Sequence, residues 1–229
     1  MHISDGLLDN SIILVLWIID LLFGVYSIYT IRKKNNENKE KPIVITGAIT
    51  AMVFAFQMLN FPISAGTSGH LLGYMIMAIF MGPSYAFVMI STILMIQAFI
   101  FADGGILALG ANIFNMGIVT YGAYCIFWIL RKKMAKTEKT DGNAVPRSLI
   151  VSGSIGAYLS LIIASFICAI EIGLSANFPY GLEITIPVMM GYHVIIGLGE
   201  MLITAAILTF MYKFGREFLP NWNEIAIWS

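Results

Sequence analysis

Charge is scarce in this sequence, and the two signs balance. Asp, Glu, Lys and Arg make up 11% of the 229 residues, the formal net charge is zero, and hydrophobic residues make up 59%. A soluble globular chain carries about twice that share of charge, and a nucleic-acid-binding surface needs a basic patch. The composition therefore excludes a soluble domain, and we expect no nucleic-acid partner. Several apolar runs reach the roughly 18 residues with which a helix crosses a bilayer, so we expect an all-α membrane protein surrounded by lipid.

Several chemical motifs are also missing. The two cysteines, Cys125 and Cys168, lie inside apolar segments with no disulfide or metal-binding spacing. No Gly-Lys dipeptide occurs, so the chain has no Walker A loop for ATP. No His-Glu-x-x-His helix occurs either, which excludes an intramembrane zinc protease of that type. We therefore expect no enzymatic activity in this chain.

Apolar segments separated by charged or turn-forming residues predict seven transmembrane helices. Pro42 opens the second segment, and Gly82-Pro83 separates the third from the fourth. Nothing indicates a second, soluble domain, so residues 1–229 are expected to form one polytopic domain. The expected spans are residues 12–31, 43–61, 69–81, 84–101, 107–130, 149–174 and 186–214.

Basic residues are absent from every loop on one side of these spans. All thirteen Lys and Arg lie within residues 32–41, 131–147 and 213–216. The positive-inside rule makes these segments cytoplasmic, which places the N-terminus outside and the C-terminus in the cytoplasm. The outer loops and the spans carry acids but no bases, so the outer half of the protein should attract cations.

The first two residues, Met1 and His2, offer three nitrogen donors in a row. The α-amine and the His2 amide close a five-membered chelate ring, and the amide with imidazole Nδ1 closes a six-membered ring. A flat set of nitrogens suits Ni(II) or Cu(II), whereas Zn(II) prefers a tetrahedron. No positively charged n-region precedes the first span, so we expect this segment to be retained rather than cleaved. The simpler alternative is a frayed terminal residue without a role.

The predicted topology places all three histidines, His2, His70 and His193, toward the outer face. A fourth equatorial position on the metal would be free for a histidine from elsewhere in the chain. His193 and Glu200 are seven residues apart on one helix face, where they could equally form an interhelical hydrogen bond or lie near the site. Asp5 could orient a site imidazole or be a solvated acid.

Motifs along nearly the whole chain resemble the substrate-binding (S) components of energy-coupling-factor (ECF) transporters for nickel and cobalt, the NikM/CbiM family. The matching stretches are Met1–Gly6, Gly66–Gly73, Gly82–Pro83, Asp103–Gly105, Leu109–Asn112, Asn115–Gly117 and His193–Glu200.

The resemblance implies a seven-helix S component in a prokaryotic cytoplasmic membrane, with its N-terminal segment inserted into the bundle from outside. It implies a metal held by the Met1 amine, the His2 amide and imidazole, and His70. The side chains expected around these ligands are Asp5, Ser68, Asp103, Asn112, Asn115, His193 and Glu200. Ser4 stands where the family usually has proline, which loosens the entry turn but removes no donor.

The resemblance also implies a function and partners. The chain would capture Ni(II), or Co(II), outside the cell and deliver it inward with a transmembrane coupling subunit, two cytoplasmic ABC ATPase subunits and a small additional membrane subunit of the NikN type. The metal would be the transported substrate, and no organic cofactor is expected. The start of the chain, the Ser68-Gly69-His70 sequence and Asp103 follow the nickel type.

A secondary transporter or channel is the alternative function. Asp20, Asp103, Glu171 and Glu200 are ionisable residues within or beside the apolar segments. Such residues often line proton or cation paths in transporters.

The N-terminal chelate predicts the magnetic state of bound nickel. Four nitrogens in a plane make Ni(II) low-spin, so the nickel-loaded protein should be diamagnetic and yellow to orange. An oxygen-rich site built on Asp103, Glu171 and Glu200 would instead give paramagnetic, pale green Ni(II). Absorption and magnetic measurements on protein with a native N-terminus separate the two, and a paramagnetic centre would rule out the chelate.

Overall fold

The computed structural model describes residues 1–35, 43–63, 67–136, 138 and 145–215. Gly66 of the motif before His70 and much of the two expected cytoplasmic loops lie outside the described residues. The helices are α1 (Asn10–Asn35), α2 (Ile43–Met58), α3 (Tyr74–Met81), α4 (Pro83–Ile100), α5 (Leu109–Ile113), α6 (Thr120–Ala135), α7 (Arg147–Leu174) and α8 (Gly181–Phe214), with a π-helical segment η1 (Phe114–Val119) and two short strands, β1 (Phe61–Ile63) and β2 (Thr67–Gly69).

Five helical stretches of the described chain are long and apolar enough to cross a membrane. They are residues 10–33, 83–100, 109–135, 147–174 and 181–214. The prediction of a multi-pass helical membrane protein is therefore confirmed. The shorter helices α2, with 16 residues, and α3, with 8, fall at the other two expected spans. The orientation across the membrane stays a prediction.

The expected third span, residues 69–81, is wrong at its start. Helix α3 begins only at Tyr74, because Thr67–Gly69 pairs with Phe61–Ile63 as an antiparallel hairpin. Two other bounds also differ from expectation: α8 begins at Gly181 rather than at residue 186, and the fifth span is interrupted by η1. A hairpin needs only backbone pairing, which the apolar pattern of the second span does not reveal.

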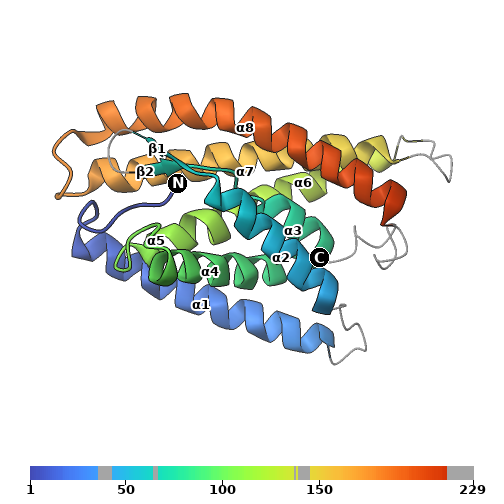
Figure 1. Ribbon diagram of the computed structural model, residues 1–229, viewed down its shortest axis with the longest axis horizontal. Coiled ribbons are helices and arrows are strands. Elements are labelled where there is room, and N and C mark those ends of the chain that lie inside the picture. The colour runs from blue at the N-terminus through green and yellow to red at the C-terminus, as the bar shows by residue number, and fades with distance from the viewer. Residues whose placement is uncertain (36–42, 64–66, 137, 139–144, 216–229) are drawn as a thin grey trace.

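Helix α3 lies at the centre of the bundle, and all eight of its residues are buried. Figure 1 shows α7 and α8 side by side along one flank and α1 with α4 along the other. The outer helices α1 and α8 expose large apolar side chains, such as Leu22 and Ile195. Such faces suit contact with lipid.

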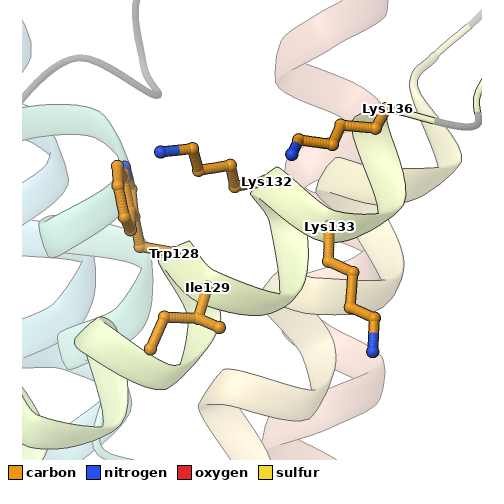
Figure 2. A pocket seen from close by; sticks show the side chains of 5 residues that line it. All are labelled: Trp128, Ile129, Lys132, Lys133 and Lys136. Atoms are coloured by element: carbon orange, nitrogen blue, oxygen red, sulfur yellow. The ribbon is translucent and has the colours of Figure 1, made fainter.

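The C-terminal end of α6 carries a cluster of bases beside an aromatic ring. Figure 2 shows Lys132 extending toward the Trp128 ring while Lys133 points away from it, and the Lys132 ammonium lies 4.8 Å from the centre of that ring. A shallow pocket of about 200 Å³ is lined by Trp128, Ile129, Lys132, Lys133 and Lys136. Trp and Lys are typical of the cytoplasmic interface of a membrane protein.

Side chains of two helices, α2 and α8, hold the segment that joins β2 to α3 by hydrogen bonds. Glu200 of α8 accepts the backbone N–H groups of Leu72, at 2.8 Å, and Gly73, at 2.7 Å. Gln57 of α2 donates to the Leu72 carbonyl at 2.7 Å. The two bonds to Glu200 satisfy amides just ahead of α3, the bond from Gln57 satisfies a carbonyl there, and together the three fix the segment that carries His70.

We expect replacement of Gly73 to lower the stability of the fold, because its backbone has φ +69° and it packs against Val53. A Cβ at this position would lie 2.7 Å from a Val53 methyl carbon. Gly73→Ala should lose about 1–2 kcal/mol from the left-handed backbone alone, and more from the overlap. Thermal unfolding in detergent measures the loss. Gly122→Ala, where an added Cβ meets nothing within 4 Å, is the matched control; equal melting temperatures for the two variants would contradict the prediction.

Candidate metal centre

The first three residues of the chain are buried inside the bundle. Met1 and Ile3 are 0% exposed and His2 is 3% exposed. Ile3 forms an antiparallel bridge with Thr67, so the segment lies along β2. In Figure 1 the N-terminus accordingly lies beside the hairpin, inside the outline of the helices.

Asn112 of α5 clamps the backbone of Ile3 on both sides. Its Oδ1 accepts the Ile3 N–H at 2.8 Å, and its Nδ2 donates to the Ile3 carbonyl at 3.2 Å. The Gly105 N–H also donates to that carbonyl, at 2.8 Å. Gly104, with φ +91°, brings the 103–105 turn against His2, and an added Cβ would lie 3.3 Å from His2 Cβ. The path of residues 1–3 is thus set by backbone hydrogen bonds.

Asp5 has a role that neither sequence interpretation anticipated. It is exposed, and its carboxylate accepts the N–H groups of Ile106, Leu107 and Ala108 at 2.8–3.0 Å. It therefore contacts no imidazole. These hydrogen bonds satisfy three amides of the turn that precedes α5, and they tie the segment that follows Ile3 to the helix that clamps Ile3.

The Met1 amine and the His2 amide both face Ser68. The amine donates to the Ser68 carbonyl, and the His2 N–H donates to Ser68 Oγ at 3.3 Å. Burial lowers the pKa of the Met1 amine from 8.0 to about 5. At neutral pH this amine is therefore uncharged and carries a lone pair that can bind a metal.

The rings of His2 and His70 stack on one another, with centroids 4.4 Å apart and planes inclined by 25°. His70 Nδ1 lies 2.8 Å from the Leu71 carbonyl, so Nδ1 carries the proton and Nε2 holds the lone pair. Nε2 of each ring is buried without a hydrogen-bond partner among the described residues. His70 can therefore offer Nε2 to a metal.

Asp103 contacts His2 directly. Asp103 Oδ1 lies 2.9 Å from His2 Nδ1, and Asn60 donates to the other carboxylate oxygen. Burial raises the pKa of Asp103, but the hydrogen bonds from His2 and Asn60, together with its electrostatic interactions with His2 and the Met1 amine, outweigh the burial and lower the pKa. Asp103 is therefore an anion at neutral pH. Chelation through His2 Nδ1 would displace this hydrogen bond and turn the imidazole.

Two further buried side chains approach the histidines. His193 interacts electrostatically with His70 and with the Met1 amine, while its Nδ1 bonds to the Met189 carbonyl at 2.8 Å. Gln97 lies within hydrogen-bonding reach of His2, and neither of its amide atoms has a partner in the described part of the chain. Sequence reasoning missed Gln97, because a lone glutamine in an apolar helix gives no pattern to follow.

Two of the expected surrounding residues make their contacts elsewhere. Asn115 donates to Glu171 at 2.6 Å, and Glu200 holds the segment before α3. No three His, Cys, Asp or Glu side chains in the described ranges form a group that could hold a metal. The oxygen-rich site on Asp103, Glu171 and Glu200 is therefore not formed.

The site brings together an amine, an amide and two imidazoles. These donors come from Met1, His2 and His70, and an ionised Asp103 lies beside them. Neutral nitrogen donors suit a late divalent transition metal better than Mg²⁺ or Ca²⁺, which prefer oxygen. The arrangement is suited to binding a metal.

Comparisons with known proteins agree with this reading. Residues 2–218 match the model of the CbiM family, described as the cobalt uptake substrate-specific transmembrane region. A putative fused nickel transport protein NikMN of Archaeoglobus fulgidus is 38% identical over 92% of this chain, which spans only 65% of that longer relative. A cobalt transport protein CbiM of Thermosipho melanesiensis is 27% identical over 95% of this chain and 88% of its own length.

Solved structures give the same result. The crystal structure of a truncated transition metal transporter is 31% identical, with a TM-score of 0.77, over 92% of this chain and 98% of its own. A second crystal structure of a transition metal transporter gives 31% identity and a TM-score of 0.78, with 94% of each chain covered. The resemblance noted in the sequence is confirmed: the chain belongs to the CbiM family, in which its relatives are named as nickel and cobalt transport proteins.

Proposed function

We propose that this chain is the substrate-binding component of an ECF-type importer and captures Ni(II) from outside the cell. The observation that carries the proposal is the convergence of the Met1 amine, the His2 amide and the stacked imidazoles of His2 and His70 in one buried place. In the proposed complex the ligands are the amine, the His2 amide and Nδ1, and His70 Nε2. Nickel is favoured over cobalt because Ni(II) binds nitrogen sites more tightly in the Irving–Williams series.

The proposed partners supply the energy for transport. The sequence has no ATP-binding loop, so a transmembrane coupling subunit and two cytoplasmic ATPases would drive delivery inward across a prokaryotic cytoplasmic membrane. Two relatives are named as fused nickel transport proteins NikMN and a third as LarMN, and this chain spans 64–65% of their lengths. These names support a NikN-type component among the partners.

The free amine provides the first test. A peptide tag placed before Met1 replaces the amine by an amide, and it has no room where Met1 is fully buried. We expect the extended chain to lose nickel binding in isothermal titration calorimetry, while the same tag at the C-terminus leaves binding intact. Both proteins should melt at similar temperatures in detergent. An uncleaved N-terminal fusion that binds nickel as tightly as the native chain would overturn the proposal.

The two histidine ligands give the second test. His2→Ala removes an imidazole and one chelate ring, and His70→Ala removes the donor held by the segment before α3. Each should weaken nickel binding at least ten-fold, which corresponds to about 1.4 kcal/mol. His193→Ala serves as the control and should have a smaller effect, because His193 supplies no ligand in the proposed complex. An affinity within about two-fold of wild type, roughly 0.4 kcal/mol, would remove that histidine from the site.

A further inference from the structure

A second group of polar side chains lies inside the membrane-spanning helices, apart from the residues proposed to bind nickel. Asp20 of α1 is 5% exposed, Asn115 of η1 is 0% exposed, and Glu171 of α7 is 8% exposed. Asn115 Nδ2 donates to Glu171 Oε2 at 2.6 Å, and the carboxylates of Asp20 and Glu171 interact electrostatically. The acid of α7 and the amide of η1 are thus in direct contact, and the acid of α1 lies within electrostatic range of that acid.

This group has many acceptors and only one donor. Both oxygens of Asp20, Oε1 of Glu171 and Oδ1 of Asn115 are buried without a hydrogen-bond partner within the described ranges. A buried carboxylate without a counter-ion is costly, and two close together are costlier still. The bases that α1 and α7 carry are Arg32, Lys33, Lys34 and Arg147, which lie at the predicted cytoplasmic ends of these helices, twelve or more residues along the chain from Asp20 or Glu171. They are therefore too far away to supply the charge. Something positively charged has to be held there instead.

The backbone is also unusual at this place. Asn115 lies in η1, where the helix widens to the π form. Thr120 stabilises this turn by donating to the carbonyls of Met116, at 2.6 Å, and Gly117, at 3.0 Å. Single π turns occur often at functional sites, because they re-aim side chains that a regular helix would place elsewhere. Here the turn aims an amide at Glu171.

We propose that Asp20, Glu171 and Asn115 form a second cation site within the membrane, which holds a small hard cation, a proton or Na⁺. Carboxylate and amide oxygens are the ligands such cations prefer, and intramembrane acids of this kind serve as proton or sodium sites in transporters. The site goes beyond the proposed nickel function, since it uses none of the nickel ligands. It is connected to them through α5 and η1: Asn112 clamps Ile3, and Asn115, three residues later, holds Glu171.

The test compares the wild type with Asp20→Asn and Glu171→Gln, which keep the side-chain shapes. Infrared spectra of the purified protein at neutral pH report protonated carboxyl groups. Melting temperatures are measured in buffers that contain either NaCl or choline chloride. Glu183→Gln, an exposed acid at the start of α8, is the matched control and should change neither signal. Nickel binding by each variant shows that it is folded.

A bound proton predicts a protonated carboxyl band that Asp20→Asn or Glu171→Gln removes, with no effect of sodium. Bound Na⁺ predicts a sodium-dependent rise in the melting temperature, which both variants lose. Either result supports the site. A wild type with neither signal would overturn the proposal, and so would signals that persist in both variants. Asn115→Leu provides a further variant, and it should weaken whichever signal the wild type shows.

Discussion

The structure depends on how the backbone of Ile3 is held. Within a bundle, every buried N–H and C=O group needs a partner, and Ile3 finds its partners in Asn112, Gly105 and the bridge to Thr67. These bonds fix the two residues that precede Ile3, so the Met1 amine and the His2 amide are held in place. A chain terminus is ordinarily the most mobile part of a protein. Here the hydrogen bonds convert it into part of the core.

The donors are fixed from two directions. Residues 1–3 approach along β2, while Glu200 and Gln57 hold the segment that carries His70. Burying the amine has an electrostatic cost, because the pKa drop from 8.0 to about 5 corresponds to roughly 4 kcal/mol in favour of the neutral form. The docked segment binds fewer protons than a solvent-exposed one between these two values. Docking is therefore fully stable above pH 8 and weakens as the pH falls toward 5.

The sequence predicts the helices well because long apolar runs leave a membrane chain few alternatives. The N-terminal nitrogens could be named as candidate donors from the sequence, since chelate rings follow from covalent structure, and their role as ligands stays a prediction. The sequence did not reveal the hairpin before His70, the π turn at Asn115 or the hydrogen bonds from the amides of residues 106–108 to Asp5. Each depends on backbone groups meeting across more than a few residues, and a pattern of side chains carries no information on such pairing. The sequence missed Gln97 for a related reason: the side chain that it approaches, His2, comes from a distant part of the chain.

Charge balance explains why an acid lies beside a site of neutral nitrogens. In the proposed complex a divalent metal that displaces the proton of the His2 amide leaves one net positive charge in a buried place. Asp103, whose other oxygen keeps its hydrogen bond from Asn60 when His2 turns to the metal, supplies one negative charge without having to become a ligand. A carboxylate that bound the metal itself would favour oxygen-seeking ions and higher coordination numbers. An acid that lies beside the ligands without binding the metal neutralises the charge and leaves the nitrogens to set the coordination geometry. We therefore attribute the proposed preference for nickel to the backbone path of residues 1–3.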